Sequence, residues 1–341
     1  MISANKLVNK FIEVLNKRQK EIILKRFGLD SEQKTLSSLG KQFGVTRERV
    51  RQIQNNALKL IKEKNQNNLD YKNLINKIEK ILKNNGGLAR VDKILEELKP
   101  EVSNLNENNL SFFLVFYPKI KFYEENNDFY PFYFLEDVNL KNVFGFVNKW
   151  INLLKSKKQE VLDGKYHKLF EEFIKKEKIL KNQAISFISI SKKIKVNSYG
   201  DIGLSDWPEI NPRVIRDKIY LVLKKEKKPV HFKHISKKIY ENRLSEKLIG
   251  TPTIHNELIK DKRFVLVGRG IYALKEWGHE PGTVKDIIIK LLKKEGPMRS
   301  RAIVLAIQKD KFFKQNTILA NLQNKNYFER LADGTYKIKQ A

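Results

Sequence analysis

Hydrophobic residues recur every three or four positions through the first 64 residues, which is the spacing of one buried face on a helix. Two helices are predicted from Leu7, Phe11, Ile12 and Leu15 and from Ile22, Ile23 and Phe27. Gly28 follows the second group, and glycine favours the left-handed conformation that ends many helices. The N-terminal segment is therefore predicted to be entirely helical.

Two threonines mark where the next helices begin. Thr35 precedes a short apolar pattern, and Thr46 precedes a long one that runs from residue 47 to about residue 63; threonine is a favourable N-cap. Between these patterns, residues 43–45 (Phe-Gly-Val) predict a tight turn. The polar run at 62–68 is interpreted as a linker. A short helix, a tight turn and a longer helix together predict a helix-turn-helix.

An internal repeat occupies the C-terminal part of the chain. Residues 253–274 (TIHNELIKDKRFVLVGRGIYAL) align with residues 317–338 (TILANLQNKNYFERLADGTYKI) at a constant offset of 64. The paired positions upstream, at an offset of 68, are Ile219/Ile287, Leu223/Leu291, Pro229/Pro297, Ile235/Ile303 and Ile239/Ile307. Each copy predicts a helix, a short break, two helices and two strands joined by a glycine-containing turn. That order is typical of a winged helix.

Two weaker copies are predicted before these. Strands are expected near 120–123 and 130–135 in the first copy, and helices near 143–155, 166–177 and 183–190 in the second. The predicted fold class is mainly α with small β wings, with an N-terminal helix-turn-helix followed by tandem winged-helix units. The predicted domains are a helix-turn-helix at 1–66, an acidic, aromatic-rich winged helix at 70–137, a winged-helix-like unit at 138–212, and winged helices at 213–280 and 281–341.

Composition narrows the classes of function. The chain has no cysteine, which excludes disulfides, thiol catalysis and cysteine-ligated zinc. It has no apolar run of about 18 residues and no signal-peptide pattern, so we expect a cytoplasmic protein without a membrane partner. The net charge of +29 favours a nucleic-acid partner, although the abundance of Lys, Asn and Ile is also typical of AT-rich codon usage.

The second helix of the helix-turn-helix carries the most informative chemistry. Its apolar stripe is predicted from Val50, Ile53, Ala57 and Ile61. The opposite face carries the expected base-contacting residues Arg47, Glu48, Arg51 and Gln52. Arginine pairs with guanine, glutamine with adenine, and glutamate accepts from cytosine in the major groove. The alternative is that this face is an ordinary solvated surface.

The same residues resemble region 4 of the sigma-70 family of bacterial transcription initiation factors. The matching text within residues 15–62 is LNKRQKEIILKRFGL, TLSSLGKQFGVTRERVRQI and ALKLIK. The resemblance implies that the second helix reads the minus-35 element of promoter DNA through Arg47, Glu48, Arg51 and Gln52. It further implies phosphate contacts by Arg18, Arg26 and Thr35. The expected location is then the bacterial nucleoid.

The family resemblance also implies a protein partner. The first half of such a module docks on the β flap of RNA polymerase core through apolar residues, for which the candidates are Ile22, Ile23, Phe27 and Leu29, although each could equally be core. The resemblance covers about 50 of the 341 residues. Because the region that reads and melts the minus-10 element is not expected, autonomous promoter opening is not expected either.

Residues 213–277 resemble the HARE-type winged helix found in the RNA polymerase delta subunit and beside some restriction endonucleases. The resemblance lies in TPTIHNELIKDKRFVLVGRGIYALKEWG, from Thr251 to Gly278. Arg263, Arg269 and Lys275 lie around the predicted wing, where phosphate contacts are expected. Phe264, Val265, Val267 and Tyr272 are predicted to be core.

No catalytic or cofactor site is predicted. His231 and His234 are a histidine pair without further ligands nearby in sequence, so no metal is expected, and no nuclease or hydrolase constellation is evident. We therefore expect a non-enzymatic, double-stranded-DNA-binding transcription protein with no cofactor or small-molecule substrate. The alternatives are a delta-like polymerase accessory protein that acts through protein contacts, and the DNA-targeting subunit of a restriction or defence system.

The net charge is unevenly distributed among the predicted units. Residues 1–66 carry 15 cations and 6 anions, whereas residues 70–137 carry 9 cations and 12 anions. Codon usage alone predicts similar charge in every unit. The acidic unit, which is also rich in Phe and Tyr, is therefore the best candidate for a protein-facing surface.

Overall fold

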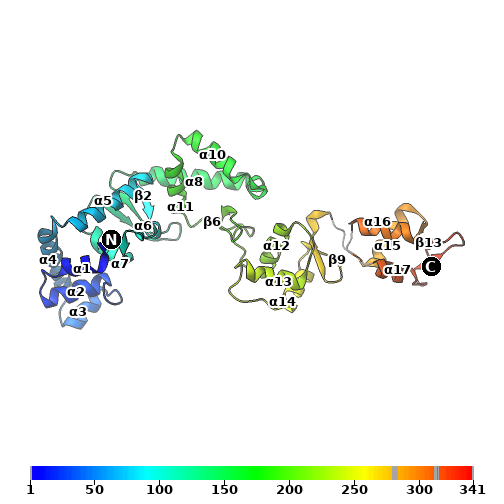
Figure 1. The fold of residues 1–341 in the computed structure, drawn as a ribbon, viewed down its shortest axis with the longest axis horizontal. Coiled ribbons are helices and arrows are strands. Elements are labelled where there is room, and N and C mark those ends of the chain that lie inside the picture. Colours follow the sequence, from blue (N-terminus) through cyan, green and yellow to red (C-terminus); the bar gives the residue numbers. More distant parts are fainter. Residues whose placement is uncertain (1, 279–282, 311–312, 314, 340–341) are drawn as a thin grey trace. The chain divides into compact units, whose positions relative to one another are not determined.

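The structure is a computed structural model that describes residues 2–278, 283–310, 313 and 315–339. It contains two compact units, which divide the chain at residues 194 and 195 (Figure 1). The chain is mainly helical, with small sheets in both units. Among the described helices, none combines the length and the apolar character needed to cross a bilayer.

The described part of the first unit contains eleven α-helices, a π-helical segment, five strands and the first residue of a sixth strand. The helices are α1 (Ala4–Ile12), α2 (Lys17–Phe27), α3 (Leu36–Phe43), α4 (Arg47–Asn65), α5 (Leu69–Asn84), α6 (Val91–Leu98), α7 (Glu107–Leu114), α8 (Leu140–Ser156), α9 (Lys158–Glu160), η1 (Val161–Lys165), α10 (Tyr166–Glu177) and α11 (Lys181–Ser189). The strands are β1 (Ile2–Ser3), β2 (Leu88–Arg90), β3 (Val102–Ser103), β4 (Ile120–Tyr123), β5 (Phe132–Leu135) and β6 (Ile194–Val196), the last of which crosses the boundary between the units.

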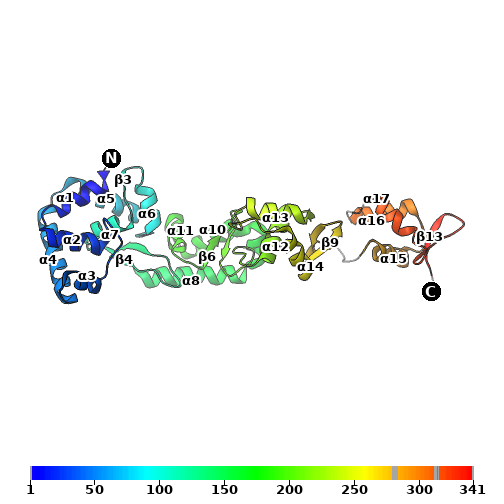
Figure 2. The same ribbon diagram turned by 90° about the horizontal axis from the view of Figure 1, so that it is seen from below.

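The helix boundaries near the N-terminus follow the predicted caps. The side chain of Thr35 accepts a hydrogen bond from the amide of Ser38, and that of Thr46 accepts one from the amide of Arg49, both at 3.1 Å. Gly28 ends α2 at a φ of 66°, the left-handed conformation that glycine adopts without strain. In both views α2 lies between α1 and α3 (Figures 1 and 2). The predicted helix-turn-helix is thus present.

The predicted linker at 62–68 is wrong. Helix α4 continues to Asn65, which is only 8% exposed, and α5 begins at Leu69 after a three-residue turn. Asn68 caps α5 by accepting a hydrogen bond from the amide of Tyr71 at 3.1 Å. The run contains neither proline nor glycine, so α4 continues into it as far as Asn65, with Lys62, Glu63 and Lys64 on the exposed side of the helix.

One hydrophobic core joins the helix-turn-helix to the segment that follows it. Side chains from α1, α2 and α4 pack in the same cluster as those from α5, α6 and α7. Phe11 and Phe112, for example, are 1% and 0% exposed, and their ring centroids lie 6.2 Å apart. A smaller cluster that includes Ile22, Leu39 and Val50 holds α2, α3 and α4 together.

A three-stranded antiparallel sheet completes residues 69–135. The strand order is β2-β5-β4, with β5 central, and Leu88 pairs with Phe134. The face that carries Leu88 and Phe132 packs with Val143 of α8 and Ile190 after α11. Most of the aromatic side chains that suggested a protein-facing surface therefore contact this chain's own helices, either here or in the core with α1 and α2.

Residues 138–212 depart from the pattern of the other predicted winged helices. The helices expected near 143–155, 166–177 and 183–190 are present as α8, α10 and α11. The sheet that follows has only two strands, β6 and β7 (Ile202–Leu204), because no short strand lies between the first two helices. Gly164, at a φ of 88°, accommodates the kinked segment before α10.

The second unit contains two segments of the same architecture. The elements of the first are α12 (Ile215–Glu226), β8 (Val230–His231), α13 (Phe232–Glu241), α14 (Thr251–Lys260), β9 (Phe264–Gly268), β10 (Ile271–Leu274) and η2 (Lys275–Trp277). Those of the second are α15 (Val284–Glu295), β11 (Met298–Arg299), α16 (Ser300–Asp310), α17 (Gln315–Leu322), β12 (Phe328–Arg330) and β13 (Thr335–Ile338). Each has its own core and a three-stranded antiparallel sheet whose last strand is central.

The internal repeat is visible in the strand register. Tyr272 pairs with Val230 in one sheet, and Tyr336 pairs with Met298 in the other. The expected alignment of the first helices is wrong by one residue. The buried counterparts of Ile219 and Leu223 are Ile288 and Leu292, and not Ile287 and Leu291 as the sequence suggested. The connection to the short strand is one residue shorter in the second copy, where Gly296 ends α15.

Candidate nucleic-acid interface

The packing of α3 against α4 determines which face of α4 is exposed. Val50, Ala57 and Ile61 are fully buried, as the predicted stripe requires, and Ile53 is half-buried. Gly40 allows the close approach between these helices, because a β-carbon there would lie 2.8 Å from the carbonyl oxygen of Val45. Larger residues at position 40 would therefore push the turn away from α3.

The four residues expected to contact bases are all exposed on the first turns of α4. These are Arg47, Glu48, Arg51 and Gln52. The guanidinium of Arg51 donates two hydrogen bonds to the carboxylate of Glu48, at 2.9 and 2.7 Å. The hydrogen bonds from Arg51 lower the pKa of Glu48, so the pair persists at acidic pH until the pH falls through that lowered pKa.

Arg49 belongs to the same surface, although no contact was expected of it from the sequence. Its guanidinium donates to the side-chain oxygen of Gln52 at 3.2 Å. The sequence indicates this contact only through the separation of Arg49 and Gln52 by three residues, which brings two side chains together on a helix. Two neighbouring pairs, Glu48–Arg51 and Arg49–Gln52, thus orient the exposed groups before any ligand binds.

The residues expected to contact phosphate near α4 have local structural roles as well. Arg18 donates to the carbonyl oxygen of Phe43 at 3.4 Å, and Arg26 donates to that of Lys34 at 3.3 Å. Thr35 caps α3. Arg18 and Thr35 are exposed, whereas Arg26 is half-buried. Arg18 and Thr35 are therefore the more accessible of the three.

The residues expected to dock on polymerase lie largely inside the protein. Ile22 and Ile23 are fully buried. Phe27 and Leu29 are half-buried and pack on the core that contains α7, where the rings of Phe27 and Phe112 are 5.4 Å apart. Asn108 fixes this contact by donating to the carbonyl oxygen of Gly28 at 2.8 Å. Helix α7 therefore covers much of the apolar surface that these residues form.

The residues expected to contact phosphate in the second unit fall into two groups. Arg269 and Lys275 are exposed, at the turn between β9 and β10 and just after β10. Arg263 instead pairs with Asp261 at 2.7 Å and Asp217 at 3.0 Å, and lies over the ring of Tyr220. Burial raises the pKa of Asp261, but the hydrogen bonds from Arg263 and the positive charges of the nearby arginines lower that pKa by more, so the pKa lies below its ordinary value. Arg263 is thus held by its own domain.

We expect Arg263→Ala to destabilise its domain and Arg269→Ala to leave the stability nearly unchanged. The first should lower the free energy of unfolding of its domain by about 1–2 kcal/mol, since the pairs are lost but solvent already screens a side chain that is 36% exposed. The second should change stability by less than about 0.5 kcal/mol. Urea denaturation of the two variants measures this difference. Equal stability would mean that the Arg263 pairs contribute nothing.

The core positions expected in this domain are confirmed. Phe264 and Tyr272 pack in the main core, and Val265 and Val267 pack in a small cluster on the opposite face of β9. His231 accepts a hydrogen bond from the amide of Lys233 as the N-cap of α13. Among the described residues, no group of three or more His, Asp or Glu side chains is arranged to hold a metal ion.

Comparison with known proteins agrees with the geometry of the first domain. The family described as Sigma-70, region 4 matches residues 11–63. The chain is 44% identical over 62 residues to the RNA polymerase sigma factor sigB of Arabidopsis thaliana, which is 18% of this chain and 11% of that protein. It is 44% identical over 57 residues to RpoD of Helicobacter pylori strain 26695, which is 16% of this chain and 8% of that protein.

A third relative, RpoS of Coxiella burnetii, is 43% identical over 56 residues, which is 16% of each chain. The chain thus spans only a small part of these relatives' lengths. No solved structure matches the chain. The match begins four residues before the expected boundary of 15 and ends one residue after 62. Residues 11–63 are therefore a sigma-70 region 4 domain.

Proposed function

We propose that this chain is a DNA-binding transcription protein in which α4 reads a minus-35-like promoter element. The main support is the exposed set Arg47, Glu48, Arg51 and Gln52, on a helix whose opposite face is buried in a sigma-70 region 4 domain. A helix with such residues near its N-terminus suits the major groove, where side chains of these types distinguish base pairs.

The three repeated segments at 69–135, 215–277 and 284–338 are proposed to be winged helices. Each has a helix, a short strand, two helices and two strands, with the additional strand β3 between α6 and α7 in the first segment, and each three-stranded sheet places the last strand in the centre. We assign the HARE type to the segment at 215–277. The exposed Arg269 and Lys275 at its wing are proposed to contact DNA phosphates, which adds affinity without sequence preference.

Contact with RNA polymerase core is a second part of the proposal. The sigma factors matched above are RNA polymerase factors by name. Docking on the β flap through Ile22 and Ile23 is disfavoured here, since both are buried and α7 covers the neighbouring Phe27. We therefore propose that DNA recognition is the main activity of the region 4 domain and that any polymerase contact uses another surface.

Fluorescence anisotropy with the purified full chain tests this function. A duplex that carries a minus-35-like element should bind about tenfold or more tightly than a scrambled duplex of equal length. Both affinities should fall steeply as salt rises, because lysines and arginines release counterions from the phosphates. Equal affinity for the two duplexes would reject sequence recognition.

The same measurement with core polymerase separates the alternatives. A delta-like accessory protein should bind core polymerase without DNA and show no preference between the duplexes. A DNA-targeting subunit of a restriction or defence system should prefer a sequence but should not bind core polymerase. We expect sequence preference in the absence of polymerase.

A further inference from the structure

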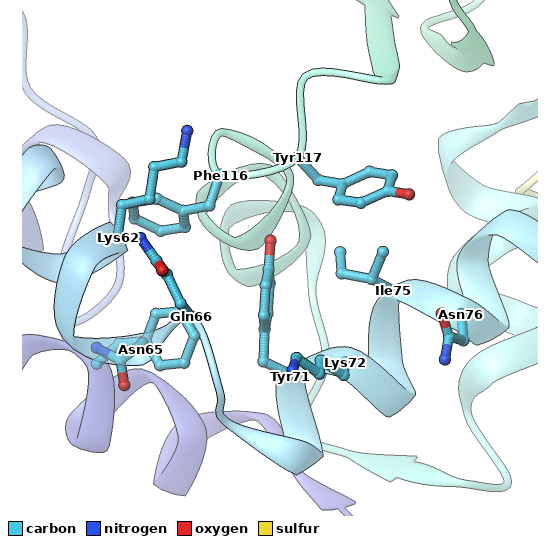
Figure 3. A pocket seen from close by; sticks show the side chains of 10 residues that line it. Lys62, Asn65, Gln66, Tyr71, Lys72, Ile75, Asn76, Phe116 and Tyr117 are labelled. Atoms are coloured by element: carbon cyan, nitrogen blue, oxygen red, sulfur yellow. The ribbon is translucent and has the colours of Figure 1, made fainter.

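A pocket of about 300 Å³ opens where the last turn of α4 meets α5 and the residues after α7 (Figure 3). It lies away from the N-terminal turns of α4, which carry the exposed base-reading set. The polar run that the sequence suggested to be a linker forms one of its walls, through Lys62, Asn65 and Gln66. This size is at the lower end of the range for small-molecule sites.

Aromatic rings form the interior of the pocket. Phe11, Tyr71, Phe116 and Tyr117 line it, and Tyr71 stands at its centre in Figure 3, between Gln66 and Ile75. The rings are held in place: the hydroxyl of Tyr71 donates to the carbonyl oxygen of Phe113 at 3.3 Å, and that of Tyr117 donates to Glu79 at 2.6 Å. Tyr71 and Tyr117, which are half-buried, therefore offer preformed walls on which a flat ring can stack, whereas Phe11 is only 1% exposed and packs against the ring of Tyr71.

The charges that line the pocket are of one sign. Lys62 from α4 and Lys72 from α5 line it, and no carboxylate does so among the described residues. Figure 3 shows these two lysines on opposite sides of Tyr71. The nearby carboxylate of Glu79 accepts from Tyr117, which lowers the pKa of Glu79. Side-chain amides of Asn65, Gln66 and Asn76 add hydrogen-bonding groups.

We propose that this pocket binds a small, planar aromatic anion. The rings supply stacking surfaces, and the amides can satisfy polar edges of the ligand. Lys62 and Lys72 supply the positive charge for an anionic group, with Lys72 Nζ donating to Asn67 Oδ1 at 3.2 Å in this structure. The volume admits one ring system with its substituents. The shared chemistry fits both a nucleoside monophosphate and an aromatic carboxylate, which are two sources of the same kind of ligand.

Isothermal titration calorimetry on the full chain, without DNA, tests the site. The probes are adenosine monophosphate and indole-3-carboxylate, with adenosine and inorganic phosphate as controls that each lack one half of the ligand. At least one probe should bind with a Kd below about 1 mM, and about tenfold or more tightly than both controls. The result does not depend on DNA binding, so its failure is distinct from failure of the proposed function.

Two variants locate the binding within the pocket. Lys62→Gln combined with Lys72→Gln should weaken the probe about tenfold or more, because both cations are removed from exposed positions that do not support the core. Asn76→Trp should abolish binding by filling the space. The matched controls are Lys59→Gln on α4 and Asn73→Trp on α5, both exposed and outside the pocket lining.

Three results would overturn the proposal. The first is that neither probe binds. The second is that adenosine or inorganic phosphate binds as tightly as the probes. The third is that the paired lysine variant and Asn76→Trp bind the probe as tightly as the control variants Lys59→Gln and Asn73→Trp. If only adenosine monophosphate binds, the natural ligand is a nucleotide. If only indole-3-carboxylate binds, it is an aromatic acid, and either result supports the site.

Discussion

Replacing Arg51 with alanine is expected to lower affinity for the preferred duplex by about 5- to 150-fold, while affinity for random duplexes changes only about twofold. Arg51 lies on the exposed face of α4, and its guanidinium is already oriented by two hydrogen bonds to Glu48. A base contact from such a group contributes about 1–3 kcal/mol of discrimination. A phosphate contact would instead weaken binding to every sequence equally.

The matched control for Arg51→Ala is Lys59→Ala. Lys59 is exposed on the same helix, two turns further on, so its loss removes one positive charge without changing Arg47, Glu48, Arg51 or Gln52, the residues proposed to contact bases. It should weaken both duplexes by the same small factor and leave the preference intact. Affinity measured by fluorescence anisotropy at one fixed salt concentration compares the two variants. Equal losses on preferred and random duplexes with Arg51→Ala would refute the assignment.

Replacing Phe112 with alanine should destabilise the region 4 domain and the segment after it together, by about 3–5 kcal/mol. Phe112 lies on α7, outside residues 11–63, and is fully buried. Its ring lies 5.4 Å from that of Phe27 on α2 and 6.2 Å from that of Phe11 on α1. Because the two segments share this core, neither should unfold alone.

Hydrogen exchange followed by mass spectrometry resolves this effect along the chain. Peptides from α1 to α4 and from α5 to α7 should lose protection together in the Phe112→Ala variant. The control is Phe122→Ala on β4, where the side chain is 49% exposed and contributes less to the core. Loss of protection confined to α5–α7 would show that the region 4 domain is independently stable.

Local features of the fold could be predicted because their causes are local. Thr35 and Thr46 cap helices through bonds that span three residues, and Gly28 ends α2 because glycine tolerates a positive φ. The exposed set on α4 follows from helical spacing alone. The later parts of the two repeats could likewise be aligned, because Ile254 and Ile318 are both fully buried where the same core is built.

Contacts between distant segments could not be predicted from the pattern. Nothing near Ile23 indicates that α7, more than 80 residues later, completes its core. Arg263 looks like a free cation in sequence, yet it lies in the turn before β9 and pairs with Asp217 of α12. The run at 62–68 is polar enough for a linker, and only the packing of Asn65 and the turn at Asn68 show why it is ordered.

Selection of binding sites from a random pool of duplexes most directly tests the claim that α4 reads base sequence. The purified full chain, without polymerase, should enrich one short motif that resembles a minus-35 element. The Arg47→Ala, Arg51→Ala double variant should enrich none while it still retains DNA at low salt. Recovery of an unchanged pool by the unaltered chain, or of the same motif by the double variant, would contradict the account.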